Sequence, residues 1–344
     1  MVVLASPRSA KNNPYIDLLY EGVLGQGIEV QDMSLENARS RCDICHVHWP
    51  DLALSSKSMV GSLNKVLRLL GLLAWFKLRW GAKVIWTVHN LEPHDRTLPL
   101  WWRRLFYKAW FQFVDGCIFM SEASRRAFEA KYQIKYPHTI IPHGHYCDMY
   151  ERVWLDQGLR ERLGIRSGDV VLGHYGQIRE YKNVPYLMRE FSKLEGAHLK
   201  LIVAGKVRQQ DGSLLEEIKQ LAESDPRIHF APGFVSDEAM KGLYELTHWA
   251  VLPYRNILNS GSALLALSLG CPVLVPDLPT MAELQSQLSP RFVQLIPRSG
   301  LLSGLNLCLD AARVRCERSD LSELDWHVLS AKLVEFYERI STVK

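Results

Sequence analysis

The sequence lacks most of the features that mark specialised classes of protein. Its 344 residues contain no run of eighteen apolar residues, so we expect no transmembrane helix. The segment that comes nearest, 66–80, is interrupted by Arg68, Lys77 and Arg79. The seven cysteines follow no disulfide framework, and Met1 leads directly into a short apolar stretch rather than a secretory signal. We therefore expect a cytoplasmic protein.

Three signatures of nucleotide or metal binding are also missing. No Gly-x-Gly-x-x-Gly pattern follows the first expected strand of either half, which disfavours NAD, and no Walker motif is present, which disfavours ATPase chemistry. No Asp-x-Asp pair occurs, which argues against a metal-chelated sugar nucleotide. Cys42 and Cys45 form a Cys-x-x-Cys pair, but without a second pair we interpret it as ordinary strand packing. The sequence predicts no metal site and no cofactor.

The composition is that of a soluble globular protein, with 47% hydrophobic and 23% charged residues. At roughly 150 residues a domain, the length suggests two domains. The net charge of +4 hides a basic segment, because residues 57–126 hold twelve Lys or Arg against four acidic residues. Such a segment favours contact with a polyanion or an anionic membrane surface.

Short apolar strands alternate with helices along the whole chain. We expect strands at 2–5, 43–48, 83–88, 116–120 and 139–142, and then at 170–175, 199–204, 228–231, 249–253 and 273–275. This alternation predicts an α/β protein of two Rossmann-like parallel-sheet domains that face a central cleft. We place the first domain at 1–155 and the second at 165–322. A helix near 326–344 could pack back on the first domain.

Ligands of open parallel sheets bind beyond the carboxyl ends of the strands. The loop after the first strand of the second half contains Gly176, Arg179 and Lys182. The glycine permits a tight turn, and a guanidinium and an ammonium three residues apart can converge on one diphosphate. The alternative is a solvated basic turn.

A second candidate anion site precedes a short apolar helix in the same half. Its residues are Tyr254, Asn259, Ser260, Gly261 and Ser262. Small residues at a helix N-terminus expose backbone N–H groups that bind anions. Ser260 or Ser262 would also cap the helix, and capping alone is the alternative interpretation. Together the two motifs predict a diphosphate held by protein cations and amides.

A family resemblance follows from these motifs and their order. Gly205, Gly233-Phe234-Val235, Leu252-Pro-Tyr-Arg255 and Gly270-Cys-Pro-Val273 resemble the donor-binding domain of GT-B glycosyltransferases. More narrowly, residues 10–280 are similar to the GDP-mannose-dependent β-mannosyltransferases of xanthan-type exopolysaccharide assembly. That similarity rests on Asn13-Pro-Tyr15 and on segments 46–51, 87–95, 143–146, 176–182 and 259–269.

The resemblance implies that the two domains bind different substrates. The second would bind GDP-mannose, with the base resting near Gly205, Phe234 and Val235, and the first would bind a polyprenyl-diphosphate-linked oligosaccharide. A UDP-sugar is an alternative donor. A non-catalytic protein that binds a sugar nucleotide or a membrane is the alternative of another class.

One departure from the family bears on the reaction. Retaining GT-B enzymes usually carry Glu-x7-Glu where this chain has Ile257 to Leu265, and neither end is acidic here. We therefore expect an inverting transfer, with a retaining one as the alternative. Inversion needs a base on the acceptor side. We favour Asp95 over Asp51, and Glu92 and His94 are further candidates.

Histidines and other polar residues at strand ends of the first domain complete the expected site. His89 looks like the sugar-contacting histidine of related GT-B enzymes, and its alternative is a structural strand-end histidine. Candidates for binding the acceptor or the sugar are Asn13, His48, Trp49, Asn90, His94, His143 and His145. Because the histidines lie in separate loops, we expect hydrogen-bonding roles rather than a metal site.

Two segments of the first domain, 65–80 and 101–111, mix aromatic, aliphatic and basic residues. Trp and Tyr favour the lipid–water boundary, and Lys and Arg favour anionic head groups. We interpret the segments as a peripheral docking surface for the inner face of the plasma membrane. Amphipathic core helices with a solvated face are the alternative. We expect no nucleic acid partner, because no recognised binding module accompanies the basic residues.

Overall fold

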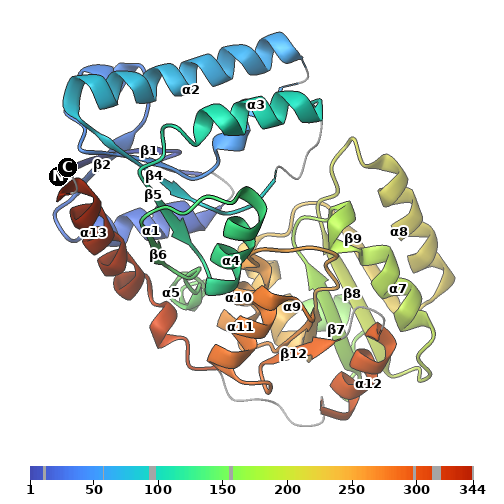
Figure 1. The fold of residues 1–344 in the computed structure, drawn as a ribbon. Coiled ribbons are helices and arrows are strands. Elements are labelled where there is room, and N and C mark those ends of the chain that lie inside the picture. Colours follow the sequence, from blue (N-terminus) through green and yellow to red (C-terminus); the bar gives the residue numbers. More distant parts are fainter. Residues whose placement is uncertain are drawn as a thin grey trace. The chain divides into compact units, whose positions relative to one another are not determined.

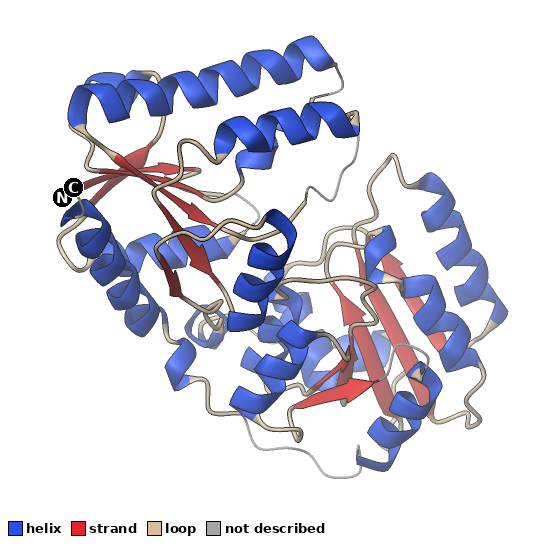
Figure 2. Cartoon of the chain, viewed as in Figure 1, coloured by secondary structure: helices blue, strands red, loops and turns tan. Residues whose placement is uncertain are grey.

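Two compact units make up the protein (Figures 1 and 2). The computed structural model describes residues 1–10, 13–56, 58–92, 98–154, 158–296, 300–311 and 319–342. One unit comprises Met1–Gly144 and Glu323–Lys344, and the other comprises His145–Ser322. The second unit thus begins at His145, whereas we expected the first domain to end at 155 and the second to begin at 165. Each unit contains one six-stranded parallel sheet, as the alternation of strands and helices predicts.

The first unit has its strands in the order β2-β1-β3-β4-β5-β6. Their bounds in that order are Glu29–Asp32, Val2–Ser6, Ile44–Val47, Lys83–Thr87, Gly116–Phe119 and His138–Ile140. The helices are α1 (Pro14–Leu24), η1 (Glu36–Arg39), η2 (Pro50–Leu54), α2 (Met59–Trp80), α3 (Leu100–Trp110), α4 (Glu122–Tyr132) and α13 (Trp326–Thr342).

Successive side chains of these strands enter two different cores. Val3 and Ile85 pack with α1 and α13 on one face of the sheet. Leu4 and Trp86 pack with α2, α3 and α4 on the other face. Because both faces are covered, the central strands read as continuous apolar runs rather than alternating ones.

Helix α13 returns from the far end of the chain to complete the first unit. It packs against α1 so closely that a Cβ atom at Gly22 would lie 2.5 Å from the Oγ of Ser330. The amide of Gln26 donates to the same hydroxyl at 3.1 Å. Leu329, Leu333 and neighbouring residues of α13 are buried in the core beneath the sheet. The first unit is therefore assembled from two segments that are distant in sequence.

The second unit has its strands in the order β12-β11-β10-β7-β8-β9. Their bounds in that order are Val293–Ile296, Val273–Pro276, Trp249–Val251, Val170–Tyr175, Leu199–Gly205 and Ile228–Pro232. The helices are α5 (Cys147–Glu151), α6 (Leu159–Arg162), η3 (Glu180–Lys182), α7 (Val184–Ser192), α8 (Gly212–Ser224), α9 (Asp237–Leu246), α10 (Gly261–Ser268), α11 (Pro279–Leu288) and α12 (Leu301–Ala311); η4 (Ser322–Leu324) spans the return to the first unit. Helices α7, α8 and α12 cover one face of the sheet.

Helix α2 is apolar on two opposite faces. Val66, Leu73 and Phe76 are buried in the core of the first unit, whereas Leu67 and Leu78 are exposed. Among the described residues it is the one helix long and apolar enough to cross a membrane, by length and composition only. Scattered basic residues interrupt its apolar run in the sequence, yet the mean hydropathy of an 18-residue window is still 1.3. Core helices of soluble proteins pass the same test, and one face of α2 is a core face.

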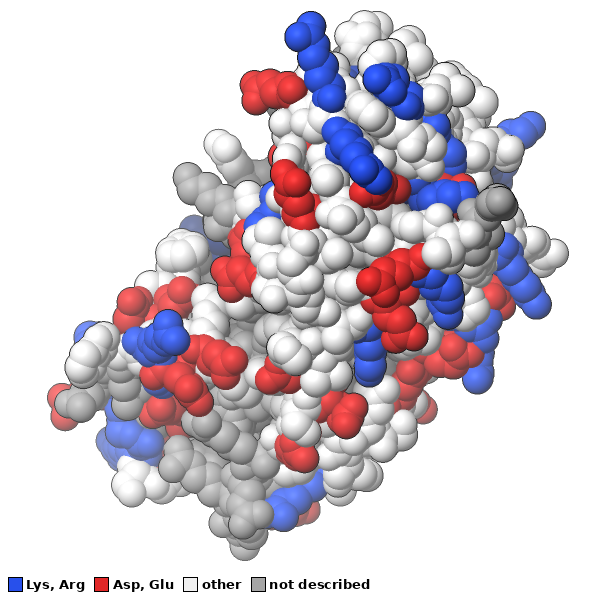
Figure 3. Space-filling model, turned by 90° about the vertical axis from the view of Figure 1, so that its left-hand side faces the viewer, with Lys and Arg blue, Asp and Glu red and all other residues white. Residues whose placement is uncertain are grey.

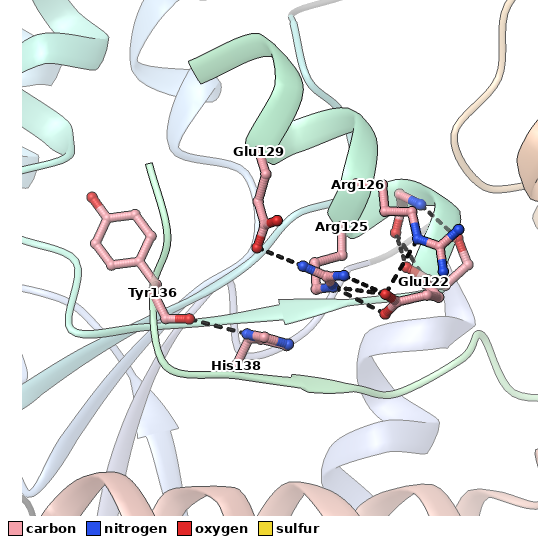
Figure 4. Close-up of polar contacts among 8 residues, drawn as sticks. Glu122, Arg125, Arg126, Glu129, Tyr136 and His138 are labelled. Carbon is pink, nitrogen blue, oxygen red and sulfur yellow. Dashed lines mark hydrogen bonds and ion pairs between the residues drawn. The ribbon is translucent and has the colours of Figure 1, made fainter. Parts of the chain in front are cut away.

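Ion pairs offset part of the basic excess of the first unit. On α4, Arg125 pairs with Glu122 and Glu129, and Arg126 also pairs with Glu122 (Figure 4). Lys77 pairs with Asp115 at 2.5 Å. Basic and acidic side chains are interspersed on the face drawn in Figure 3. The net charge of a sequence segment therefore overstates the positive field that it presents.

Candidate active site

The loop after β7 in the second unit holds the expected cations. It begins at Gly176, which has a φ of 102°, and runs beside the end of β8. A Cβ atom at Gly205 would lie 1.7 Å from the carbonyl oxygen of Gly176, and Gly205 has a φ of 156°. Only glycine fits where the two strand ends approach so closely.

Lys182 is the buried cation of this loop. It is the last residue of η3, and it is only 6% exposed. Its Nζ lies 3.5 Å from the hydroxyl oxygen of Ser262. The same nitrogen lies 5.4 Å from the centre of the Tyr254 ring. Burial lowers the pKa of Lys182, and the nearby guanidinium of Arg179 lowers it further. In the described part of the chain no carboxylate pairs with this ammonium, which makes it a ready partner for an anion.

Arg179 is held in place by its own loop. Its guanidinium donates to the carbonyl oxygen of Ile178 at 2.9 Å and to the side-chain oxygen of Gln177 at 2.8 Å. Arg179 precedes η3, the short helix that ends at Lys182, so the two cations lie in the same loop. The loop therefore carries two adjacent cations, one exposed to solvent in part and one buried.

The N-terminus of α10 faces the ammonium of Lys182. Ser260 is the N-cap, and its hydroxyl accepts a hydrogen bond from the backbone N–H of Ala263 at 3.1 Å. Burial raises the pKa of Tyr254 to about 12, against smaller lowering by the hydroxyls of Ser262 and Ser260. The N-cap Ser260 and the ammonium of Lys182 thus both lie at the N-terminus of α10, where the helix dipole adds partial positive charge.

His174 of β7 lies beneath this site and was not anticipated from the sequence. It is fully buried, with Nδ1 2.8 Å from the carbonyl oxygen of Val251 and its ring perpendicular to Tyr254 at 6.1 Å. Burial lowers its pKa to about 3, so the imidazole is neutral. Because it lies inside an apolar strand, the sequence pattern indicates an ordinary core residue.

The remaining donor-site candidates lie in loops of the second unit. Phe234 and Val235 follow β9, and the Phe234 side chain is 85% exposed. Asn259 immediately precedes the N-cap of α10. Gly261 is the first residue of that helix.

In the first unit, histidines gather at the carboxyl ends of β3 and β4. His46 and His48 lie on the same face of the chain, two residues apart, and their rings are 4.2 Å apart. His48 Nδ1 lies 3.1 Å from His89 Nε2. Burial lowers the pKa of His46 to about 3 and lowers the pKa values of His48 and His89 as well. All three imidazoles are therefore neutral near pH 7.

Aromatic rings enclose His89. The indole of Trp49 stacks on it, with centroids 4.4 Å apart and planes at 22°. The ring of Tyr15 meets it edge to face at 5.3 Å and also contacts His143 at 4.8 Å. Burial lowers the pKa of His143 to about 4. The structure thus brings together four expected residues, His48, Trp49, His89 and His143, from the loops after β3, β4 and β6.

Other expected residues of the first domain have local roles. The side chain of Asn13 caps α1 by accepting from the N–H of Tyr15 at 3.2 Å. His145 accepts from the N–H of Cys147 and belongs to the second unit rather than the first. Asn90 lies directly after His89 and is partly exposed.

The carboxylate candidates differ in their surroundings. Asp51 lies in η2, partly buried, and its charge raises the pKa of Tyr107 after the larger effect of burial. Glu92 pairs with Lys131 at 2.5 Å and with Arg103 at 3.8 Å, which suits it less to act as a base. Asp95 and His94 lie outside the described residues.

Comparison with known proteins decides the family. The model of glycosyl transferases group 1 matches residues 169–293, and that of glycosyltransferase family 4 matches residues 66–148. The chain is 31% identical to the GDP-mannose:glycolipid 4-β-D-mannosyltransferase of Xanthomonas campestris pv. campestris over 327 residues, which is 92% of this chain and 86% of that protein. The chain belongs to the GT-B glycosyltransferases. A second protein of that name from the same pathovar is 30% identical over 330 residues.

Solved structures agree on the fold of this glycosyltransferase. A structure titled trehalose-6-phosphate from E. coli, bound with UDP-2-fluoro glucose, aligns with a TM-score of 0.70 at 9% identity, over 100% of this chain and 99% of that one. Anabaena HepE in complex with UDP and glucose aligns with a TM-score of 0.64 at 13% identity, over 98% and 97%. At such low identity the likeness concerns the GT-B fold alone.

Proposed function

We propose that this glycosyltransferase moves mannose from GDP-mannose to a polyprenyl-diphosphate-linked oligosaccharide with inversion, in the synthesis of an exopolysaccharide. The observation that carries the proposal is the buried ammonium of Lys182, 3.5 Å from Ser262 at the capped N-terminus of α10. The names of the two Xanthomonas relatives support mannose as the sugar, GDP as the nucleotide and a glycolipid as the acceptor.

The diphosphate of the donor would bind where the loop after β7 meets α10. Lys182 and Arg179 supply positive charge, and the N-terminal N–H groups of α10 supply hydrogen bonds. Each charge-assisted hydrogen bond contributes on the order of 1.5–3 kcal/mol. This is enough to stabilise the negative charge that develops on the leaving GDP without a metal ion. We therefore propose a metal-independent enzyme.

Inversion requires a base that removes the proton of the acceptor hydroxyl as it attacks. Asp51 and Asp95 are the candidates in the first unit. A positioned base contributes about 10²–10⁴-fold to a rate. Asp51→Asn and Asp95→Asn should therefore differ in kcat. The variant that lacks the base should lose kcat by that factor with little change in KM, and the other variant should keep its kcat.

A lipid-linked acceptor calls for contact with a membrane, and the outer face of α2 suits that contact. Val60, Leu63, Leu67 and Leu78 are exposed at helical spacing, with Leu78 87% exposed. Trp101 and Leu105 are exposed on α3, which is tied to α2 by a hydrogen bond from the indole of Trp102 to Ser62. Exposed apolar side chains gathered along one side of a helix in this way mark an interaction site.

Basic residues flank the apolar face of these two helices. Lys65, Arg68 and Arg79 lie on α2, and Arg104 and Lys108 lie on α3. Each basic residue near an anionic leaflet contributes about 1 kcal/mol. We therefore propose peripheral attachment to the inner face of the plasma membrane, where a polyprenyl-diphosphate-linked sugar is presented.

The deciding experiment combines the purified protein, GDP-mannose and a lipid-linked oligosaccharide, with NMR of the product. The proposal expects a new β-mannosyl linkage, formed equally well with and without EDTA. UDP-sugars in place of GDP-mannose serve as the control. Transfer from a UDP-sugar, an α-linked product or loss of activity in EDTA would each overturn the corresponding part, and binding without any transfer would favour a non-catalytic protein.

A further inference from the structure

The side chain of Trp49 is presented from a short, defined turn. Trp49 follows β3 by two residues, at the carboxyl end of the parallel sheet, where ligands of such sheets bind. Pro50 comes next and disfavours a helical backbone at Trp49. The carbonyl oxygen of Trp49 accepts from the N–H of Leu52 at 3.1 Å. The backbone that carries the indole is therefore fixed on both sides.

His89 supports one face of this indole. The two rings stack with centroids 4.4 Å apart and planes at 22°. His89 is itself held by its neighbours, since Tyr15 meets it edge to face at 5.3 Å and His48 Nδ1 lies 3.1 Å from its Nε2. The indole thus lies on a ring that is fixed by the end of another strand and by α1.

The opposite face of the indole is the one that a ligand can reach. The ring of His48 lies 5.6 Å from that of Trp49 and 5.4 Å from that of His89. With the 4.4 Å stack, these distances form a compact triangle, so the two histidines do not lie across the indole from each other. Trp49 is half-buried. The part of the indole that reaches solvent therefore belongs to its other face and its edge.

Two polar groups beside this ring are available for hydrogen bonds. In the described part of the chain, the indole N–H of Trp49 donates no hydrogen bond. Asn90 directly follows His89, is half-buried, and makes no side-chain hydrogen bond with those residues either. An indole N–H donates, whereas a primary amide both donates and accepts. An aromatic wall with a few polar groups is the usual composition of a small-molecule site.

We propose that Trp49 is a platform on which a hexopyranose ring stacks, with the indole N–H and the Asn90 amide binding its hydroxyl groups. The faces of a pyranose ring carry C–H bonds, and its rim carries hydroxyls. The negative face of an aromatic ring attracts the positive hydrogens of such C–H bonds. One point rests on the proposed function: in the sugar transfer, the stacked ring belongs to the acceptor oligosaccharide.

The charge state of His89 suits this platform. Burial lowers the pKa of His89, and the neighbouring histidines lower it further, so its imidazole is neutral near pH 7. An imidazolium stacked on the indole would draw on the negative potential of the indole ring. The neutral ring leaves that potential to the C–H bonds of a sugar on the other face. His89 thus acts as the support of Trp49.

Hydroxyl-radical footprinting with mass spectrometry tests sugar binding in the whole, unmodified chain. Methyl β-D-glucoside is the probe, because its ring substituents are all equatorial and both its faces carry only C–H bonds. Sorbitol at the same concentration is the control, because it scavenges radicals similarly but has no ring face. We expect slower oxidation of Trp49 in the glucoside than in sorbitol. Trp154 of the second unit, 87% exposed, should be oxidised equally in both. Equal oxidation of Trp49 would overturn the proposal.

Variants test the platform during transfer. Trp49→Leu removes the aromatic face, so KM for the lipid-linked oligosaccharide should rise on the order of tenfold, with KM for GDP-mannose unchanged. Trp49→Phe keeps a ring without the N–H and should fall between. Trp154→Leu is the matched control and should keep both constants. A lower melting temperature and kcat with an unchanged acceptor KM would show a merely structural role and overturn the proposal, as would a rise in the donor KM alone.

The platform and the proposed function fail separately. If the glucoside protects Trp49 and no sugar is transferred, the function is wrong and the platform stands. If transfer occurs, while Trp49 is not protected and Trp49→Leu leaves the acceptor KM unchanged, the platform is wrong and the function stands. If Trp49→Leu does not fold, footprinting of the unmodified chain decides alone.

Discussion

The side-chain nitrogen of Lys182 lies 3.5 Å from the hydroxyl oxygen of Ser262, eighty residues further along the chain. Two strand-end loops thus place a buried cation against the N-terminus of α10. Binding of the diphosphate of the proposed donor would offset the cost of burying this ammonium.

Lys182→Ala should therefore have opposite effects on binding and on stability. Loss of one charge-assisted contact of about 1.5–3 kcal/mol weakens GDP binding roughly 10- to 150-fold. The free protein should keep its melting temperature or gain a little, because the buried charge is gone. Calorimetric titration and thermal unfolding measure the two effects. Lys193→Ala is the control, since that lysine is exposed and pairs with Glu190; equal GDP affinity in both variants would contradict the assignment.

Gly205→Ala should destabilise the second unit. The added Cβ meets the carbonyl oxygen of Gly176, and the positive φ of Gly205 adds strain, which costs of order 1–3 kcal/mol even without the clash. Urea unfolding measures the loss. Gly212→Ala provides the comparison, because a Cβ there meets no atom within 4 Å. Similar stabilities for the two variants would show that the strand ends move apart at little cost.

Glutamate on the outer face of α2 should weaken membrane binding. Leu67→Glu and Leu78→Glu each remove an exposed apolar side chain, whose burial in lipid is worth at most about 1.5–3 kcal/mol. We expect a loss of roughly tenfold or more in co-sedimentation with phosphatidylglycerol vesicles. Leu307→Glu, at an exposed leucine of α12 in the second unit, should bind as before. Undiminished binding of the α2 variants would exclude this face.

The buried histidines should make the first unit sensitive to acid. The pKa values of His46 and His143 fall from 6.5 to about 3 and about 4 on folding. Between pH 6.5 and these lower values the unfolded chain binds protons that the folded chain does not, so stability falls as the pH falls. The slope is about 1.4 kcal/mol per pH unit for each histidine.

Urea unfolding at pH 7.5 and pH 5 measures this effect. From the slope, each buried histidine should remove about 2 kcal/mol over the titrating part of that interval. His143→Gln should reduce the loss of unfolding free energy between the two pH values by the contribution of one histidine. His327→Gln, at an exposed position, serves as the control. Equal stability at the two pH values would contradict the burial of these rings as neutral groups.

The sequence indicated the sheets well where strands are buried on both faces. The expected strand at 199–204 is β8, Leu199–Gly205, whose apolar run is continuous. Two edge strands were missed: β2, Glu29–Asp32, and β12, Val293–Ile296. Both are short edge strands of four residues that include polar side chains, so the pattern of each resembles that of a loop.

The candidate site was predictable where it depends on local motifs and unpredictable where it depends on distant contacts. The loop with Lys182 and the cap at Ser260 follow from strand-end chemistry and helix capping. The contact of Tyr337 with His46 joins residues 291 positions apart, and no local pattern encodes it. The alternation of His46 and His48 was the one available signal that both rings point to the same side of a strand.

The return of α13 to the first unit also bears on how the protein is made. Residues of α13, among them Trp326, Leu333 and Tyr337, complete a core whose remaining members lie before residue 145. During synthesis the whole second unit leaves the ribosome before those three residues do. The second unit can therefore fold first, while the N-terminal segment still exposes the apolar sheet face that α13 will cover. Chaperones would bind that exposed face.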